Sequence, residues 1–418
     1  MDRGRPKLLP SSPSGLPTDS GVIIACAIAA LVSPMLLLLV GVFWLKSQAA
    51  PIRGRWFVLL GVITFLALFN ATKRPDGDWY WYIEGYWESF RSGLGTYLEA
   101  GGLSIRSTEP LYYYFSYVVS VLSRGSVTIL ALAITYLIYL PYAVAVERLM
   151  ERLRLKDGLA LSCLVFALIA GLTFTQSLHL VRQYLAGTVL FLVYLWILEG
   201  QTLKVVLGFT VGILLHNSFL IPGGLLLVSG FLWTSNAVRR HVFRVVFGLL
   251  LLSFVVGTVV SRWVLDSVFA LGAMKDDGGL SSVIFVIDVG LFLAAMGWLW
   301  VKRRPDGTME KETAIAVLFL TLFGGLLVGA RDLTLFLLRF YFYIEWFRVI
   351  GLIALCGLAT RGSRKVMIPG LIALISVILL HLRIERSPWD YGGGLLDHLV
   401  GSMPWWVHQM SQASWSAS

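Results

Sequence analysis

His179 to Gly200 reads HLVRQYLAGTVLFLVYLWILEG, a stretch in which a histidine, an arginine and a glutamine stand at the start of a long apolar run. The run over 183–199 has the composition of a helix that crosses a lipid bilayer. An ionised side chain at the centre of a bilayer costs roughly 3 kcal/mol on insertion scales, so charges kept beside such a run usually serve a site or a pathway. The stretch therefore predicts a membrane fold and marks a place to look for function.

The rest of the chain repeats this pattern. Of the 418 residues, 57% are hydrophobic and 14% are charged, and the mean hydropathy is +0.78. Apolar runs fall at 21–45, 56–71, 127–146, 157–177, 183–199, 203–217, 219–234, 243–261, 282–301, 313–330, 334–360 and 366–382. They predict an all-α polytopic membrane protein with about 12 to 13 transmembrane helices. The thirteenth candidate, 109–123, is shorter than the roughly 20 residues needed to cross, so a membrane-parallel or re-entrant helix is the alternative.

The predicted domain organisation has three parts. Residues 1–20 are rich in Pro, Gly and Ser and predict a disordered tail. Residues 21–382 predict a single transmembrane helical domain, with an outer loop at 72–126, and residues 383–418 predict an extracytoplasmic tail. The three cysteines lie in separate apolar runs, which predicts buried packing residues.

Short basic segments indicate the topology. Five of them fall on one face when spans alternate: ERLMERLRLK, EGQTLK, NAVRRHVFR, VKRRPDGTMEKE and TRGSRK. The positive-inside rule makes that face cytoplasmic, so the unusual polar clusters converge on the opposite face. The acidic, aromatic loop 72–108 is predicted outside, although Lys and Arg counts slightly favour thirteen spans. The net charge of +10 fits topology and anionic lipid, and no nucleic acid partner is expected.

Arginines on the predicted outer face are candidates for binding an anion. Arg182 stands beside Gln183, and a guanidinium fork can bond two phosphate oxygens at once. Snorkelling of Arg182 to lipid phosphate is the structural alternative. Arg339 and Arg383 offer two further cations at the same face.

Three side chains are candidates for a base that takes the proton of an attacking hydroxyl group: Asp78, Glu109 and His216. His216 ends a stripe with Gly208 and Gly212, which recur every four residues and so direct the histidine into the bundle. It could take a proton, orient a phosphate or simply bond to a neighbouring carbonyl. A carboxylate is therefore the favoured base, and the sequence does not choose between Asp78 and Glu109.

Aromatic side chains on the same face are candidate sugar ligands: Tyr80, Tyr82, Tyr341 and Trp389. Their rings can stack on sugar faces, and the alternative is an aromatic belt at the membrane surface. The chain contains no Walker A, HExxH or GxSxG pattern. Metal hydrolase, serine hydrolase and ATP-driven pump are therefore disfavoured, and neither a metal nor a cofactor is expected.

The order of these motifs resembles the EpsG-like group of Wzy-type polysaccharide polymerases, most closely over about 70–235. The motifs are DWYWY (78–82), EPLYYYFSYVVS (109–120), VRQYLAGTVLFLVYL (181–195), LLHNSFLIP (214–222) and RFYFY (339–343). Glu109 matches the family's EP pair, Arg182 and Gln183 its RQ pair, His216 its HxS motif and Arg339 its late arginine. Asp78 and Tyr82 keep the family's Asp and Tyr at wider spacing.

The resemblance implies a bacterial inner-membrane glycosyltransferase with GT-C-type architecture. It would join oligosaccharide repeat units carried on undecaprenyl pyrophosphate, both donor and acceptor being lipid-linked, at the periplasmic or outer face. It also implies a chain-length regulator protein as a partner. Membrane-parallel helices in the first outer loop would suit 109–123.

Three rival functions share parts of this pattern. A transferase that adds one sugar from a lipid phosphate, or a ligase of finished chains, would use similar arginines. A flippase or transporter of lipid-linked oligosaccharide would place charges along a central path. The only deeper charges are Asp288, Glu345 and Arg348, and the last two are spaced to neutralise each other within one helix, which disfavours transport.

Overall fold

The computed structural model describes residues 52–100, 109–153, 155, 157–268, 282–301, 311–330, 334–359 and 367–415. Within these ranges every regular element is a helix. The all-α class is therefore confirmed. The predicted disordered tail and the predicted first span, 21–45, lie outside the described residues.

The helices follow one another along the chain with these bounds: α3 Ile52–Ala71, α4 Gly77–Ser92, α5 Leu94–Ala100, α7 Pro110–Ser123, α8 Val127–Arg152, α9 Asp157–Phe166, η1 Ala167–Gly171, η2 Phe174–Gln176, α10 Val181–Glu199, α11 Thr202–Leu215, η3 Asn217–Phe219, α12 Leu220–Thr234, α13 Asn236–Arg240, α14 Val242–Val268, α15 Ser282–Val301, α16 Lys311–Gly329, α17 Thr334–Glu345, α18 Arg348–Ala359, α19 Met367–Glu385, α20 Leu395–Val400 and α21 Met403–Trp415.

Five helical segments of the described chain are long and apolar enough to cross a membrane: Val127–Arg152, Val181–Glu199, Asn217–Thr234, Val242–Arg262 and Lys311–Gly329. Shorter apolar helical segments lie at Leu59–Ala71, Leu159–Gly171, Thr202–Leu215 and Phe285–Val301. The chain is thus an α-helical membrane protein. The total of 12 to 13 spans stays a prediction.

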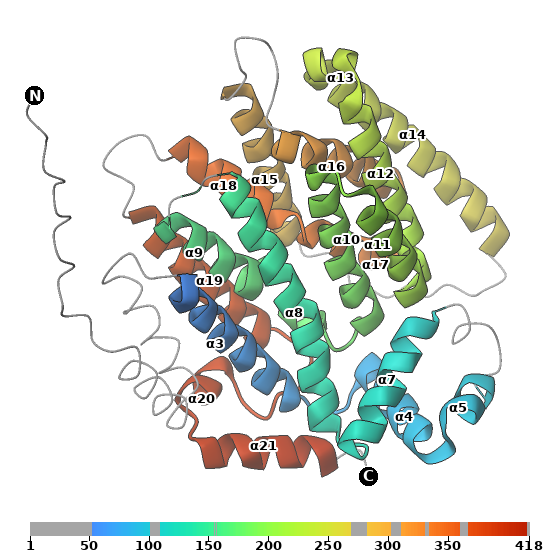
Figure 1. Ribbon diagram of the computed structural model, residues 1–418, viewed down its shortest axis with the longest axis vertical. Coiled ribbons are helices and arrows are strands. Elements are labelled where there is room, and N and C mark those ends of the chain that lie inside the picture. Colours follow the sequence, from blue (N-terminus) through green and yellow to red (C-terminus); the bar gives the residue numbers. More distant parts are fainter. Residues whose placement is uncertain are drawn as a thin grey trace, which may run out of the picture.

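Three helices of the predicted outer loop, α4, α5 and α7, gather at one end of the bundle (Figure 1). In α4, Trp79, Ile83 and Tyr86 form the buried face, which leaves Asp78 exposed. Helix α7 has Pro110 at its first turn and only 14 residues, too few to cross a bilayer. The short α7 fits the expectation of a non-crossing helix.

The opposite end of the bundle collects segments that the sequence predicts on the cytoplasmic face. Arg152 forms an ion pair with Glu312 at 2.9 Å. Nζ of Lys311 donates to the carbonyl oxygens of Ile197, at 3.3 Å, and Leu198, at 3.0 Å. Helix α13 lies at the far end from α4, α5 and α7 (Figure 1). The predicted grouping of these segments matches the fold, and the side of the membrane stays a prediction.

The predicted span over 334–360 is not one continuous helix, because the helix breaks between Glu345 and Arg348. Backbone freed by a break must find other partners inside a membrane protein, and here the carbonyl of Trp346 accepts from Oη of Tyr142 at 3.1 Å. The Glu345 carboxylate accepts from the backbone N–H of Thr173 at 2.7 Å. The expected pairing of Glu345 with Arg348 is present at 3.0 Å, across the break instead of within one helix.

The predicted span over 157–177 also ends early, at a π-helical turn that closes at Gly171. The carbonyls around this end are bonded by side chains from distant helices. Arg348 donates to the oxygen of Gly171 at 2.9 Å. Arg383 donates to those of Ala170, at 2.8 Å, and Leu172, at 2.6 Å. The buried Arg348 and the partly buried Arg383 therefore stabilise the point where the chain leaves the helix and turns toward His179.

Gly187→Ala should destabilise the bundle. A Cβ at this position would lie 2.0 Å from Nε1 of Trp346, whose ring is 1% exposed and packs against Tyr142. Forcing a methyl group into such a contact typically costs about 1–3 kcal/mol. Thermal unfolding of the purified protein in detergent measures the loss. Gly224→Ala is the matched control, because nothing lies within 4 Å of its added Cβ, and equal melting temperatures for the two variants would contradict the prediction.

Candidate active site at the outer-loop end

Glu109, Arg182 and His216 form one hydrogen-bonded cluster, although they lie far apart in the sequence. Nδ1 of His216 lies 2.8 Å from Oε1 of Glu109. Arg182 is ion-paired with Oε2 of the same carboxylate through Nη1. An ionised carboxylate only accepts hydrogen bonds, so the proton in the histidine contact belongs to Nδ1. The structure thus joins the three residues of the EP, RQ and HxS motifs.

Three helix ends bring this cluster together. Glu109 immediately precedes α7, Arg182 lies in the first turn of α10, and His216 is the extended residue between α11 and η3. The backbone N–H of Asn217 also donates to Oε1 of Glu109, at 2.9 Å. Because helix ends carry backbone groups without partners in their own helix, they suit a polar site at the edge of an apolar bundle.

The surroundings of Glu109 keep it ionised. Burial acts to raise the pKa of this carboxyl, but the hydrogen bond from His216 and the positive charge of Arg182 outweigh it and hold the pKa below its ordinary value. All the partners of Glu109 are donors. A carboxylate so fully engaged is a good anchor for Arg182 and a poor acceptor for a further proton.

Arg182 has aromatic partners as well. Its Nε donates to Oη of Tyr82 at 3.3 Å, and Nη1 to Oη of Tyr113 at 3.4 Å. The guanidinium carbon lies 5.9 Å from the ring centre of Tyr82 and 6.0 Å from that of Tyr113. Among the described residues, these bonds use Nε and Nη1 and leave the protons on Nη2 for a ligand. The side chain is 23% exposed, so an anion can reach it.

Two adjoining cavities share Asp78, Tyr82 and Arg182. The larger has a volume of about 210 Å³ and is completed by aromatic residues and a glycine: Trp81, Gly85, Tyr97, Tyr112 and Tyr113. The smaller, of about 40 Å³, is completed by His179, Leu180, Gln183 and His216. An aromatic cavity therefore meets a polar one, and Asp78 and Arg182 stand where they meet.

Of the sequence candidates, the structure brings together Asp78, Tyr82, Glu109, Arg182, Gln183 and His216. His179 does not share a helix with Arg182 and Gln183, because α10 begins at Val181. It lies in the preceding turn and still lines the smaller cavity.

Other candidates lie elsewhere. Tyr80 is exposed on α4, where its hydroxyl donates to Glu84 at 2.5 Å. Trp389 packs on His179 without lining either cavity. Arg383 bonds the backbone carbonyls that follow α9, as described above. The side chain of Arg339 lies outside the described residues, although its backbone belongs to α17.

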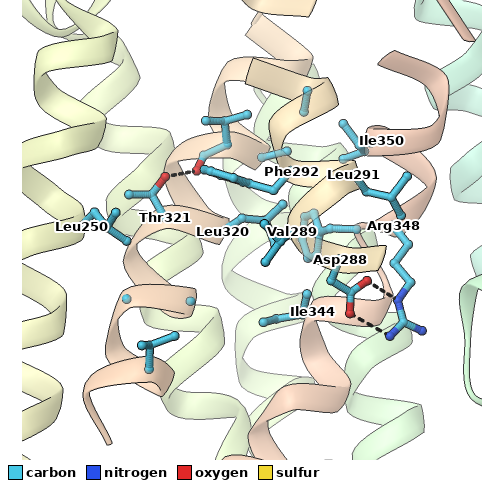
Figure 2. A pocket seen from close by; sticks show the side chains of 18 of the residues that line it. Leu250, Asp288, Val289, Leu291, Phe292, Leu320, Thr321, Ile344, Arg348 and Ile350 are labelled. Carbon is cyan, nitrogen blue, oxygen red and sulfur yellow. Dashed lines mark hydrogen bonds and ion pairs between the residues drawn. The ribbon is translucent and has the colours of Figure 1, made fainter. Parts of the chain in front are cut away.

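Tyr341 lies at a third cavity, an apolar one of about 460 Å³ between α14, α15, α16, α17 and α18. Its hydroxyl donates to the Asp288 carboxylate. Figure 2 shows that carboxylate facing the guanidinium of Arg348 at one end of the cavity, with contacts of 2.6 and 2.9 Å. The deeper charges Asp288, Arg348 and Glu345 thus neutralise one another in one cluster, in keeping with the argument against transport.

Sequence reasoning missed several residues of the site. Trp81, Tyr97 and Tyr113 line the larger cavity, and Tyr113 bonds Arg182. Tyr113 was visible within EPLYYYFSYVVS, but three consecutive tyrosines point in different directions on a helix. Only the orientation of α7 shows that Tyr112 and Tyr113 face the cavity.

In the described part of the chain, three or more His, Cys, Asp or Glu side chains nowhere come together as a group that could hold a metal ion.

Arg383→Leu should lower the stability of the protein and leave the binding of an anionic donor unchanged. The substitution removes Nη1, which donates to the carbonyls of both Ala170 and Leu172, and an unsatisfied buried polar group costs about 1–3 kcal/mol. A thermal melt and a donor titration on the folded fraction separate the two effects. Arg386→Leu, on an exposed neighbour, is the control. Unchanged stability with weakened donor binding would restore the sequence-based role of Arg383.

Fold and site together define an α-helical membrane protein with a cluster of Arg, His and Glu at one end of its bundle and an aromatic cavity beside it. The model of the EpsG family matches residues 55–392, and the chain belongs to that family. The resemblance seen in the sequence motifs is thereby confirmed. Family membership supports a polymerase of polysaccharide biosynthesis. The curated proteins and the solved structures give no match.

Proposed function

We propose that the protein joins oligosaccharide repeat units carried on undecaprenyl pyrophosphate, by glycosyl transfer at the outer face of the bacterial inner membrane. The observation that carries the proposal is the position of Arg182, at the junction of an aromatic and a polar cavity and anchored by Glu109. The aromatic cavity suits a sugar, because tyrosine and tryptophan rings stack on apolar sugar faces. The polar cavity suits the pyrophosphate.

In the proposed reaction, a hydroxyl of the acceptor sugar attacks the anomeric carbon of the donor. A C–O bond forms there, and the bond between that carbon and the pyrophosphate oxygen breaks. Negative charge builds on the leaving oxygen, and a guanidinium fixed beforehand stabilises it without further reorganisation. Glu109 and His216 hold Arg182 and the adjoining turn in place for this task.

The acceptor hydroxyl must lose its proton, and Asp78 is the proposed base. It lines both cavities and is exposed, whereas the donors around Glu109 already occupy that carboxylate. No described residue donates to the Asp78 carboxylate, which leaves it the lone pairs that general base catalysis requires.

The decisive experiment supplies the purified protein with a lipid-linked repeat unit and no nucleotide sugar. A ladder of products that grow by whole repeat units is the expected result. A requirement for another sugar donor would instead indicate a single-sugar transferase. A lack of product with any donor, together with movement of the lipid-linked unit across vesicles, would indicate a flippase.

A further inference from the structure

A stacked pair of rings lies beside the polar cavity. The imidazole of His179 packs on the indole of Trp389, with ring centres 3.6 Å apart and 25° between the planes. Trp389 belongs to the segment after α19, and this segment is bonded to the chain just before α4. Arg74 donates its backbone N–H to the carbonyl of Asp390 at 2.9 Å, and the two side chains form an ion pair at 3.1 Å. The C-terminal segment therefore holds His179 in place.

The pair is enclosed by the chain that connects α3 to α4. Nζ of Lys73 lies 4.9 Å from the ring centre of Trp389 and donates to the carbonyl of Thr175 at 3.3 Å. Gly77 has a φ of +52°, and a Cβ there would lie 3.2 Å from Trp389 and 3.4 Å from Cε1 of His179. A glycine at this position satisfies both the left-handed backbone and the close approach of the rings. The imidazole thus has little freedom to turn.

His179 is only 3% exposed, yet it lines the 40 Å³ cavity together with Asp78 and Arg182. Its Nε2 is buried and has no hydrogen-bond partner among the described residues. A polar atom left in that state costs about 1–3 kcal/mol, so it is rarely kept without a reason. The cavity has room for a small polar group, since about 10–15 Å³ suffices for one water-sized probe.

We propose that His179 contacts the substrate itself and donates a hydrogen bond from Nε2 to an oxygen of the pyrophosphate held by Arg182. The inference rests on the proposed function and assigns a further residue to its leaving-group site. Burial, and then the nearby charge of Lys73, lower the pKa of His179 to about 3, so the ring is neutral at ordinary pH. A neutral imidazole has a single N–H, and the charge that builds on the leaving oxygen strengthens the bond it donates.

The test compares His179→Phe with His179→Gln in the repeat-unit assay. Phe keeps the stack on Trp389 and removes the N–H donor, whereas the amide of Gln restores a donor at similar reach. We expect His179→Phe to lower kcat by roughly 100-fold, the scale of losing one donor to a developing oxyanion, with a smaller change in KM. His179→Gln should recover most of that loss. A packing role predicts the opposite order, because Phe stacks on the indole and Gln does not.

Binding of farnesyl pyrophosphate, measured in parallel, separates failure of this inference from failure of the proposed function. If the wild-type protein polymerises and the His179→Phe variant is equally active, only the role of His179 is overturned. Wild-type protein that neither binds farnesyl pyrophosphate nor polymerises would overturn both. If the Phe variant does not fold, His179→Met replaces it, with the same expected order against His179→Gln.

Discussion

Arg182→Ala should abolish long-chain polysaccharide in a host that lacks its own polymerase, while single repeat units remain. The side chain is the one cation common to both cavities in the described part of the chain, and Glu109 anchors it. Losing one preorganised donor to developing negative charge typically costs a factor of about 100 to 1,000 in rate, and losing a full guanidinium charge should cost at least as much. Gel analysis of the polysaccharide measures chain length, and immunoblotting measures protein level.

Arg182→Lys tests whether the fork, and not the charge alone, is required. Lysine can still neutralise Glu109, which limits damage to the fold, but it cannot bond two oxygens in one plane. We expect a folded protein with turnover reduced on the order of 100-fold. Arg91→Ala is the matched control, because Arg91 is exposed on α4 and lines neither of the two cavities. Normal long chains from Arg182→Ala would exclude this arginine from the reaction.

Asp78→Asn should reduce kcat by roughly 100- to 10,000-fold, the usual contribution of a general base. Asparagine has nearly the same shape but cannot accept the proton of the acceptor hydroxyl. Affinity for the lipid-linked donor should not fall, because the substitution removes a negative charge from the neighbourhood of an anion. Turnover and donor binding are therefore measured on the same purified protein.

Asp76→Asn is the control for this variant. Asp76 lies two residues away and caps α4 by accepting from the backbone N–H of Gly77 at 2.6 Å, a role that asparagine can also fill. It should retain activity. If donor affinity drops together with kcat in Asp78→Asn, Asp78 binds the substrate instead of acting as the base, and Glu109 or His216 takes its place as the candidate.

Local sequence patterns predicted much of the fold and part of the candidate site. Long apolar runs predicted the helical membrane architecture, because the bilayer imposes a length and a composition on each crossing that can be read without knowing the neighbours. The basic turns predicted which loops lie together, and Arg152 does meet Glu312. The motifs around Glu109, Arg182 and His216 could be placed at one face for the same reason.

Interactions between distant segments could not be read in this way. The break after Glu345 is stabilised by Thr173 and Tyr142, and the end of η1 by Arg348 and Arg383. In sequence, Arg383 looks like any cation near a membrane surface, and only its position against two freed carbonyls shows what it bonds. The pattern of charges in the sequence shows which residues need partners, but it does not show which residues those partners are.

The sequence by itself determined that this is a helical membrane protein and which polar residues stand at the ends of its helices, since hydropathy and helical spacing are local properties. Only the tertiary structure decided that Glu109 bonds both Arg182 and His216 and that His179 lies against Trp389. The physical reason is that a hydrogen bond or a ring contact extends only a few ångströms. Whether two residues come that close depends on how the whole bundle packs.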